Sequence, residues 1–393
     1  MKILVVSSVF PRFKEDSEVP WLRYSLNELK KENEVLVLAP AYKGLKSHTI
    51  DGISVKRFRY APAFLEILTH DEGAPSKMAN KPWLQLLAIP YILNGILQCF
   101  LLCKKEKPDI IHAHWPFPHG LIALFASKIF KIPLVLNFHG AELLLVKKKP
   151  WIKYFLKFVI WQATGIFANS SFTAKKIQAI KKCNVIISPY GTTLERTPSE
   201  NIHEVKGKFK ILFVGRHIER KGITYLIKAA TLLPKDKFEI RIAGTGDLTE
   251  NLKEETENYN LENVLFLGKL SKEKLQEEYQ NANAFTLPAI IDKKGDTEGL
   301  GVVLIEAAEN NLPIVASHVG GISDVIIHNK TGILVKQKSE KELAKAFLEL
   351  EKNPEFAKEL VQNAHAHIRK YFSWDSIIKA QTEAYKSFIS QIS

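Results

Sequence analysis

The segment KILFVGRHIERKG, residues 210–222, indicates the fold of this chain, because an apolar strand runs into a basic turn and then a helix. Similar apolar segments alternate with helix-like stretches such as Trp21–Lys31 and Phe172–Lys181. This alternation predicts parallel sheets with helices on both faces. The strands predicted in the first half are Ile3–Val6, Glu34–Leu38, Ile110–Ala113, Leu134–Phe138, Ile166–Asn169 and Asn184–Ile187. Those predicted in the second half are Lys210–Val214, Phe238–Ala243, Val264–Leu267, Ala284–Leu287, Ile314–Ala316 and Gly332–Val335.

The two series of strands are separated by a polar stretch, and 393 residues exceed one ordinary core. We predict an α/β protein with two doubly wound, Rossmann-like domains at 1–194 and 210–372, joined by a linker at 195–209. A C-terminal helix at 373–393 is expected to pack back on the first domain. Ligands of doubly wound sheets bind at the carboxyl ends of the strands, so we expect two such ends to face a central cleft.

The bulk composition describes a globular chain with a basic surface. The 46% hydrophobic content excludes a disordered chain, and the net charge of +13 suggests an anionic partner: nucleotide, nucleic acid or an anionic membrane surface. Three cysteines without zinc spacing are typical of a reducing compartment. The apolar start meets Pro11 and Arg12 too soon for a signal peptide, which indicates a first strand and a cytoplasmic location.

The strongest motif is TEGLGVVLIEA, residues 297–307, in which the loop Gly299-Leu300-Gly301 leads into an apolar helix. Such a loop lets backbone approach a ligand, and the amides and dipole of the helix N-terminus favour a diphosphate. We expect Glu298 in the loop beside a sugar, and Glu306 inside the helix within reach of a ribose diol. A solvated helix with incidental glutamates is the alternative, but the apolar neighbours of Glu306 make an idle charge costly.

A second motif is the basic turn of residues 215–222, where Arg216 and Lys221 can converge on phosphates. A departing nucleoside diphosphate gains negative charge, which these cations would stabilise. A basic surface turn is the alternative. The third motif is NFHGAE, residues 137–142, which places His139 at the carboxyl end of a strand. A purely structural role for His139 is the alternative.

Other motifs exclude several function classes. His112 and His114 share one strand face, but no acidic or cysteine partner is nearby in sequence, which makes a metal site a weak reading. The glycine pair at 244–246 lacks the third glycine of a dinucleotide fingerprint, because Thr249 stands there. No phosphate-binding loop of the Walker type and no nucleic-acid-binding module is found in the sequence. A dehydrogenase and a nucleic-acid-binding protein are therefore disfavoured.

Together with Pro189-Tyr190-Gly191 and GGISD at 320–324, these motifs resemble glycosyltransferase family 4, in the family's order over nearly the whole chain. The resemblance implies the GT-B fold, retention of the donor's anomeric configuration, no metal or other cofactor, and an acceptor-binding first domain. It implies catalytic roles for Glu298, His139, Arg216 and Lys221. It further implies donor contacts from Arg216, Lys221, Glu298, Gly299, Leu300, Gly301 and Glu306.

One loop departs from the family pattern. Many members carry two glycines after the first strand, where this chain has the stiffer and bulkier sequence SVFPRFKED, residues 8–16. Pro11 and Phe13 restrict this turn. Acceptor assignments from better-known relatives are therefore not carried over to this chain.

The function predicted is a hexosyltransferase that uses a nucleotide-diphosphate sugar and a glycan or lipid-linked acceptor. Because no motif offers an aspartate nucleophile, we favour metal-independent front-face transfer over double displacement. Two alternatives stay open: a nucleotide-sugar epimerase on the same fold, and a non-catalytic, membrane-associated subunit that binds sugar nucleotides.

Two segments suggest a membrane. In residues 147–161, Lys149, Lys153 and Lys157 recur every four residues. The aromatic residues of the predicted helix lie elsewhere on its surface: Trp151, Tyr154, Phe155 and Phe158. This pattern suits peripheral contact with an anionic leaflet at the inner face of the cell membrane. A core helix with solvated lysines is the alternative. Trp83–Cys103 contains no charged residue and is long enough to span a bilayer. It also contains Gln85, Pro90, Asn94, Gly95 and Gln98, so a helix packed on the first sheet is favoured over a membrane span.

Overall fold

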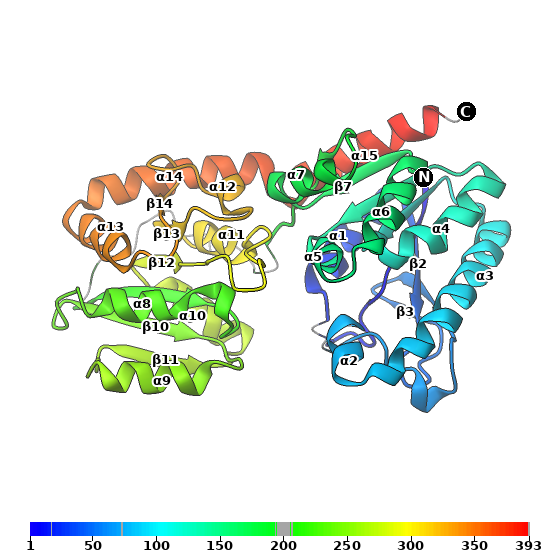
Figure 1. Ribbon diagram of the computed structural model, residues 1–393. Coiled ribbons are helices and arrows are strands. Elements are labelled where there is room, and N and C mark those ends of the chain that lie inside the picture. Colours follow the sequence, from blue (N-terminus) through cyan, green and yellow to red (C-terminus); the bar gives the residue numbers. More distant parts are fainter. Residues whose placement is uncertain (17, 72–73, 193, 195–204, 206, 392–393) are drawn as a thin grey trace. The chain divides into compact units, whose positions relative to one another are not determined.

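The computed structural model describes all residues except 17, 72–73, 193, 195–204, 206 and 392–393, and it divides into two compact units (Figure 1). Unit 1 comprises Met1–Tyr190 and Ile377–Ser393, and unit 2 comprises Gly191–Ser376. Both are α/β, so the predicted class with two Rossmann-like domains is confirmed. Most of the predicted linker, 195–209, lies outside the described residues.

The sheet of unit 1 has eight strands in the order β3-β4-β2-β1-β5-β6-β7-β8, all parallel except the pair β3 and β4. The sequence reading overlooked that pair, although Asp51 and Gly52 between them both have positive φ, which suits a two-residue hairpin. The strands are β1 Lys2–Val6, β2 Glu34–Pro40, β3 His48–Ile50, β4 Ile53–Phe58, β5 Ile110–His114, β6 Leu134–Phe138, β7 Gly165–Ala168 and β8 Ile186–Ile187.

Alternate residues of the central strands enter two separate cores, one on each face of the sheet. Leu4 and Val6 of β1 belong to one core, while Ile3 and Val5 belong to the other, because successive side chains point to opposite faces. The helices around the sheet are α1 Pro20–Leu29, α2 Ala74–Asn80, α3 Ala88–Glu106, α4 Pro116–Phe130, α5 Ala141–Lys148, α6 Trp151–Gln162, α7 Ser171–Ile180 and α15 Trp374–Ser390, with short 3-10 turns η1 Ala63–Leu65 and η2 Pro82–Leu87.

The segment 147–161 is not the single helix that its lysine spacing predicted. It is divided between the end of α5 and α6, with Lys149 and Pro150 outside both helices. Proline lacks an amide hydrogen and is tolerated at a helix start, which suits the position of Pro150 directly before α6.

Unit 2 has a fully parallel six-stranded sheet in the order β11-β10-β9-β12-β13-β14. Successive strands move outward on one side from β9 and on the other from β12, so the order reverses between these two. The strands are β9 Phe209–Val214, β10 Phe238–Ala243, β11 Val264–Gly268, β12 Ala284–Leu287, β13 Ile314–Ser317 and β14 Ile333–Val335. The helices are η3 Glu219–Lys221, α8 Ile223–Ala230, α9 Thr249–Asn258, α10 Lys272–Asn281, α11 Val302–Glu309, α12 Ile322–Val325, α13 Glu340–Lys352 and α14 Pro354–Tyr371.

Helix α15 completes one core of unit 1. Its Tyr385 and Phe388 pack against strand residues of that core, and the Tyr385 ring lies 5.9 Å from the ring of Phe167. Gly165 of β7 leaves room for the helix, since a Cβ there would come within 2.3 Å of the Phe388 ring. The last helix is thus a structural part of the first unit.

We therefore expect Phe388→Ala to lower the free energy of unfolding by about 3 kcal/mol, because it empties a buried aromatic site. The matched control is Lys386→Ala, two residues away on the exposed side of α15. Urea unfolding followed by circular dichroism measures both. Equal stabilities of the two variants would contradict the packing described for α15.

Candidate functional site

The strand order of unit 2 indicates a candidate binding edge. In open parallel sheets, ligands bind at the carboxyl ends of strands where the strand order reverses. Here that point lies between β9 and β12, and the loops that follow them are 215–222 and 288–301. Both contain motifs that the sequence marked as functional.

An ion pair joins these two loops. Lys221, in η3, donates from Nζ to Oε2 of Glu298 at 2.5 Å, and Arg220 Nη1 donates to the same oxygen at 3.1 Å. Lys221 and Glu298 are each only 9% exposed. Burial opposes ionisation of the Glu298 carboxyl group, but the charges of Lys221 and Arg220 outweigh this effect and lower its pKa. The site therefore holds a buried carboxylate whose charge two cations balance.

Glycines fix the backbone around Glu298. Gly301 has φ 85° and stands directly before α11, a left-handed conformation that favours glycine. At Gly320 any Cβ would lie 2.0 Å from the carbonyl oxygen of Glu298, and the neighbouring amide of Gly321 donates to that oxygen at 3.0 Å. The loop after β13 thus holds the backbone of Glu298 in place beside the start of α11.

The second glutamate of the motif lies deeper. Glu306 of α11 is 9% exposed, and Oε2 accepts a hydrogen bond from the hydroxyl of Tyr279 in α10 at 3.0 Å. Burial raises the pKa of Glu306. Gly299 is half-buried, while the side chain of Leu300 lies in the core, so Leu300 can meet a ligand only through its backbone.

The structure brings some predicted residues together and separates others. Arg216 has an exposed side chain and takes part in no ion pair within the described residues, whereas Lys221 meets Glu298 directly. Sequence reasoning missed Arg220 and Tyr279. Arg220 precedes Lys221 in the same basic turn, and this adjacency was the available signal; Tyr279 lies in a polar helix remote in sequence and gave none.

In unit 1, the site candidate is His139, which follows β6 directly and is half-buried. Its Nδ1 is hydrogen-bonded to the Tyr190 hydroxyl at 2.5 Å, and its Nε2 to Nδ1 of His114 at 3.0 Å. The rings of Trp21 and Trp115 lie 4.7 Å and 4.6 Å from the imidazole. Both ring nitrogens of His139 are therefore engaged within unit 1, in an aromatic cluster at the carboxyl edge of its sheet.

Burial sets the charge of this cluster. Desolvation lowers the pKa of His139 to about 3 and that of His112 also to about 3, so both are neutral near pH 7. His112 Nδ1 is bonded to the hydroxyl of Tyr385 at 2.7 Å. Within the described part of the chain, no group of three His, Cys, Asp or Glu could hold a metal ion. The imidazoles here form a polar network rather than a charged one.

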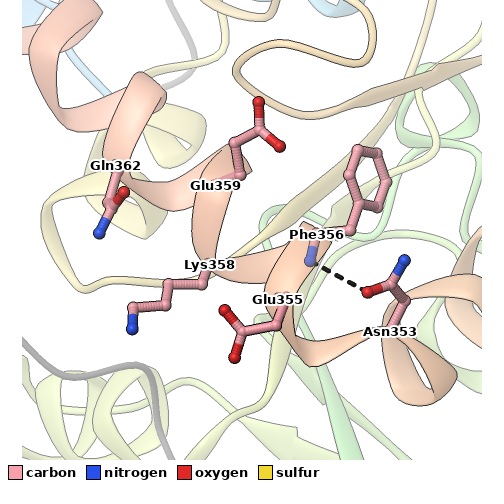
Figure 2. Close-up of a pocket in the computed structure, with 6 residues that line it drawn as sticks. All are labelled: Asn353, Glu355, Phe356, Lys358, Glu359 and Gln362. Atoms are coloured by element: carbon pink, nitrogen blue, oxygen red, sulfur yellow. Dashed lines mark hydrogen bonds between the residues drawn. The ribbon is translucent and has the colours of Figure 1, made fainter.

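A hollow on α14 is a different kind of feature. Figure 2 shows its lining side chains, which all come from the first half of this one helix and the residue before it. The side chain of Asn353 accepts a hydrogen bond from the amide of Phe356 at 3.2 Å. That hydrogen bond is an ordinary N-cap. The hollow includes no residue from the carboxyl edge of the sheet, so we do not assign it a ligand.

Comparison with known proteins gives two family matches, to the model described as "Glycosyl transferases group 1" over residues 195–367 and to "Glycosyltransferase Family 4" over 22–196. An uncharacterised glycosyltransferase of Methanocaldococcus jannaschii is 30% identical over 91% of each chain. The amylovoran biosynthesis glycosyltransferase AmsK of Erwinia amylovora is 33% identical, over 70% of this chain and 69% of AmsK. Anabaena HepE, solved in complex with UDP, is similar in fold with a TM-score of 0.70, 18% identity and coverage of 98% of this chain and 100% of HepE.

The buried carboxyl group of Glu142 generates a pH prediction. It is 3% exposed, accepts the amide of His139 at 2.8 Å, and burial raises its pKa to about 7 from an ordinary 4.5. The unfolded chain releases this proton at lower pH than the folded chain, so stability falls as pH rises from about 4.5 to 7.

Glu142→Gln removes this titration. Relative to the native chain, the variant should gain roughly 2 to 3 kcal/mol in free energy of unfolding between pH 5 and pH 8. Urea unfolding at both pH values measures the gain, with Glu262→Gln as the exposed control. A gain no larger than that of the control would refute the raised pKa.

Proposed function

Since the chain belongs to the group 1 glycosyltransferases of family 4, we propose that it moves a hexose-type sugar from a nucleoside-diphosphate sugar to a glycan or lipid-linked acceptor, with retention of configuration. The observation that carries this proposal is the buried contact of Lys221 and Arg220 with Glu298 at the switch point of unit 2. Cations and a carboxylate at one point suit a ligand with an anionic diphosphate and a polyhydroxyl sugar.

The donor diphosphate would bind between the basic turn and the start of α11. Lys221, Arg220 and the exposed Arg216 supply positive charge there, and the N-terminus of α11 adds backbone amides and the positive end of its dipole. These groups stabilise the negative charge that develops on the leaving diphosphate, which is where catalysis needs them. We propose that no metal ion is required, because the cations of the chain fill this role.

Glu298 and Glu306 would hold the two hydroxylated parts of the donor. Glu298 is ionised and can accept hydrogen bonds from the sugar hydroxyls, while Glu306 lies deeper in α11, where it can accept from the ribose. We propose that His139 acts near the reacting side of the sugar, the role that the family resemblance implies. Because its ring is neutral, it would act there through shape and polarity rather than charge.

The proposed transfer is a front-face substitution. The bond between the anomeric carbon and the diphosphate oxygen breaks, and the acceptor oxygen bonds to that carbon from the same side. The acceptor proton passes to the departing phosphate, so charge and atoms balance without an enzyme nucleophile. The chain's part is to orient the donor and stabilise the leaving group.

We also propose a cytoplasmic location with peripheral contact at the inner face of the membrane, through residues 147–161. Four aromatic side chains of α6 support this contact, since Trp151, Tyr154, Phe158 and Trp161 are between 45% and 74% exposed. Phe155, predicted with them, is half-buried and lies 5.1 Å from the ring of Phe117.

A thermal-shift screen with nucleoside-diphosphate sugars, in the presence of a chelator, tests the donor site. We expect one nucleotide class to raise the melting temperature, since ligand at a hundredfold excess over its Kd adds about 2.7 kcal/mol to the free energy of unfolding. Nucleoside monophosphates serve as controls without the diphosphate. If no nucleotide sugar stabilises the chain, the donor proposal fails. Stabilisation without transfer across a broad acceptor screen would favour a non-catalytic subunit. Donor turnover without acceptor would favour an epimerase.

Substitution of Glu298 tests its role in turnover. Glu298→Ala should lower kcat/KM about 10²-fold or more, because it removes a hydrogen-bonding group at the reacting sugar. Glu262→Ala, an exposed carboxylate of the same unit, is the control and should transfer sugar at the native rate. Rates are compared with the identified donor below the melting temperature of both variants. A native rate for Glu298→Ala would remove Glu298 from the reaction.

A further inference from the structure

Helices α3, α4 and α6 of unit 1, with η2 before α3, expose large apolar side chains to solvent. Those on η2 and α3 recur every three or four residues and so form one stripe. The exposed fractions run from 45% to 74% for Leu86, Ile89, Leu93, Leu97, Leu101, Phe125, Ile129, Trp151, Tyr154, Phe158 and Trp161. We call these residues the α3–α4–α6 face. Soluble chains rarely expose so much contiguous apolar surface without a binding partner.

Contacts between the helices show that these side chains belong to one face. Phe100 of α3 lies 5.9 Å from Phe125 of α4, ring to ring. Lys128, on the same helix as Phe125, donates from Nζ to the carbonyl oxygen of Gln162, the last residue of α6, at 3.4 Å. Figure 1 shows the three helices together on unit 1. Their apolar side chains therefore adjoin rather than form separate small patches.

The charge of the face indicates its partner. The three helices contain a single carboxylate, Glu106, and it pairs with Lys2 at 2.9 Å. Exposed lysines accompany the apolar residues on every helix of the face: Lys104, Lys105, Lys128, Lys153 and Lys157. Apolar side chains with a basic rim suit an anionic lipid surface. A second copy of the chain would oppose lysines to lysines, which disfavours a symmetric dimer through this face.

The buried side of α3 indicates whether the helix lies across a bilayer or in its plane. The segment Pro82–Glu106 is long and apolar enough to cross a membrane. However, the hydroxyl of Tyr91 is bonded to Nε2 of the buried His119 at 2.9 Å, and a Cβ at Gly95 would lie 2.8 Å from Ile122. Cys99 and Cys103 are buried in the same core. A span across the bilayer would have to break all of this packing.

We propose that the α3–α4–α6 face docks on the surface of an anionic bilayer, with α3 lying in the membrane plane rather than across it. This inference extends the membrane contact proposed above for residues 147–161. Its consequence for the acceptor rests on the proposed transferase function. A chain seated on lipid by its acceptor domain meets lipid-linked acceptors at high local concentration. Of the two acceptor classes proposed, docking selects the lipid-linked one.

Sedimentation of the full chain with vesicles tests the docking. We expect binding to phosphatidylglycerol-containing vesicles at low salt, weakened by high salt and about tenfold weaker on phosphatidylcholine alone. Leu93→Glu with Leu97→Glu should lower the partition coefficient at least about tenfold. The matched control is Leu232→Glu, which changes a leucine of unit 2 that is 47% exposed, against 50% for Leu97.

The basic rim is tested in the same assay. The double variant Lys153→Glu with Lys157→Glu should bind anionic vesicles more weakly and leave binding to phosphatidylcholine vesicles unchanged. The control is Lys341→Glu with Lys345→Glu, an exposed pair at the same spacing on α13, which should leave both unchanged. Melting temperatures close to the native one show that each variant is folded. Neither donor nor acceptor is present, so a failure here is separate from a failure of sugar transfer.

Four results would overturn the proposal. The first is no binding of the native chain at low salt. The second is binding of the double variant, Leu93→Glu with Leu97→Glu, as strong as that of the native chain. The third is resistance of bound chain to alkaline carbonate, which would show that α3 crosses the bilayer. The fourth is a concentration-dependent dimer that the leucine substitutions abolish while vesicle binding is absent, which would make a second copy the occupant.

Discussion

The buried contact between Lys221 and Glu298 is the constraint on which the candidate binding edge of unit 2 depends. A charge removed from water is costly unless an opposite charge lies close and the remaining hydrogen bonds are made. Residues 77 positions apart can meet only because β9 and β12 are neighbours in the sheet. The strand order, the turn after β9 and the glycine that approaches the Glu298 carbonyl thus belong to one arrangement.

Unit 1 also has polar groups removed from water, but these groups are neutral. His112 and His114 are buried and His139 is half-buried, and desolvation lowers the pKa of each. Tyrosine hydroxyls from a loop and from the last helix bond to two of these rings. The first unit therefore presents a neutral, aromatic edge, and the second presents an ionic one.

The sequence predicted the strands and the two loops of the candidate site well, because apolar segments and glycine turns are local signals. It could not predict which cation reaches Glu298. Arg216 and Arg220 are equally basic in the sequence, and only the geometry of η3 directs Arg220 to the carboxylate and leaves Arg216 exposed. Nor could it show that both nitrogens of His139 are engaged, since the bonding atoms come from distant elements.

The position of α15 has a consequence for the order in which the chain is built. Tyr385 and Phe388 cover the face of the first sheet that carries Phe167, yet they follow the whole of unit 2 in the sequence. On the ribosome, the second sheet can close while this apolar face of the first sheet is still uncovered. The unit that is synthesised first is thus the last to be completed, and its uncovered face is where a nascent chain would need protection from aggregation.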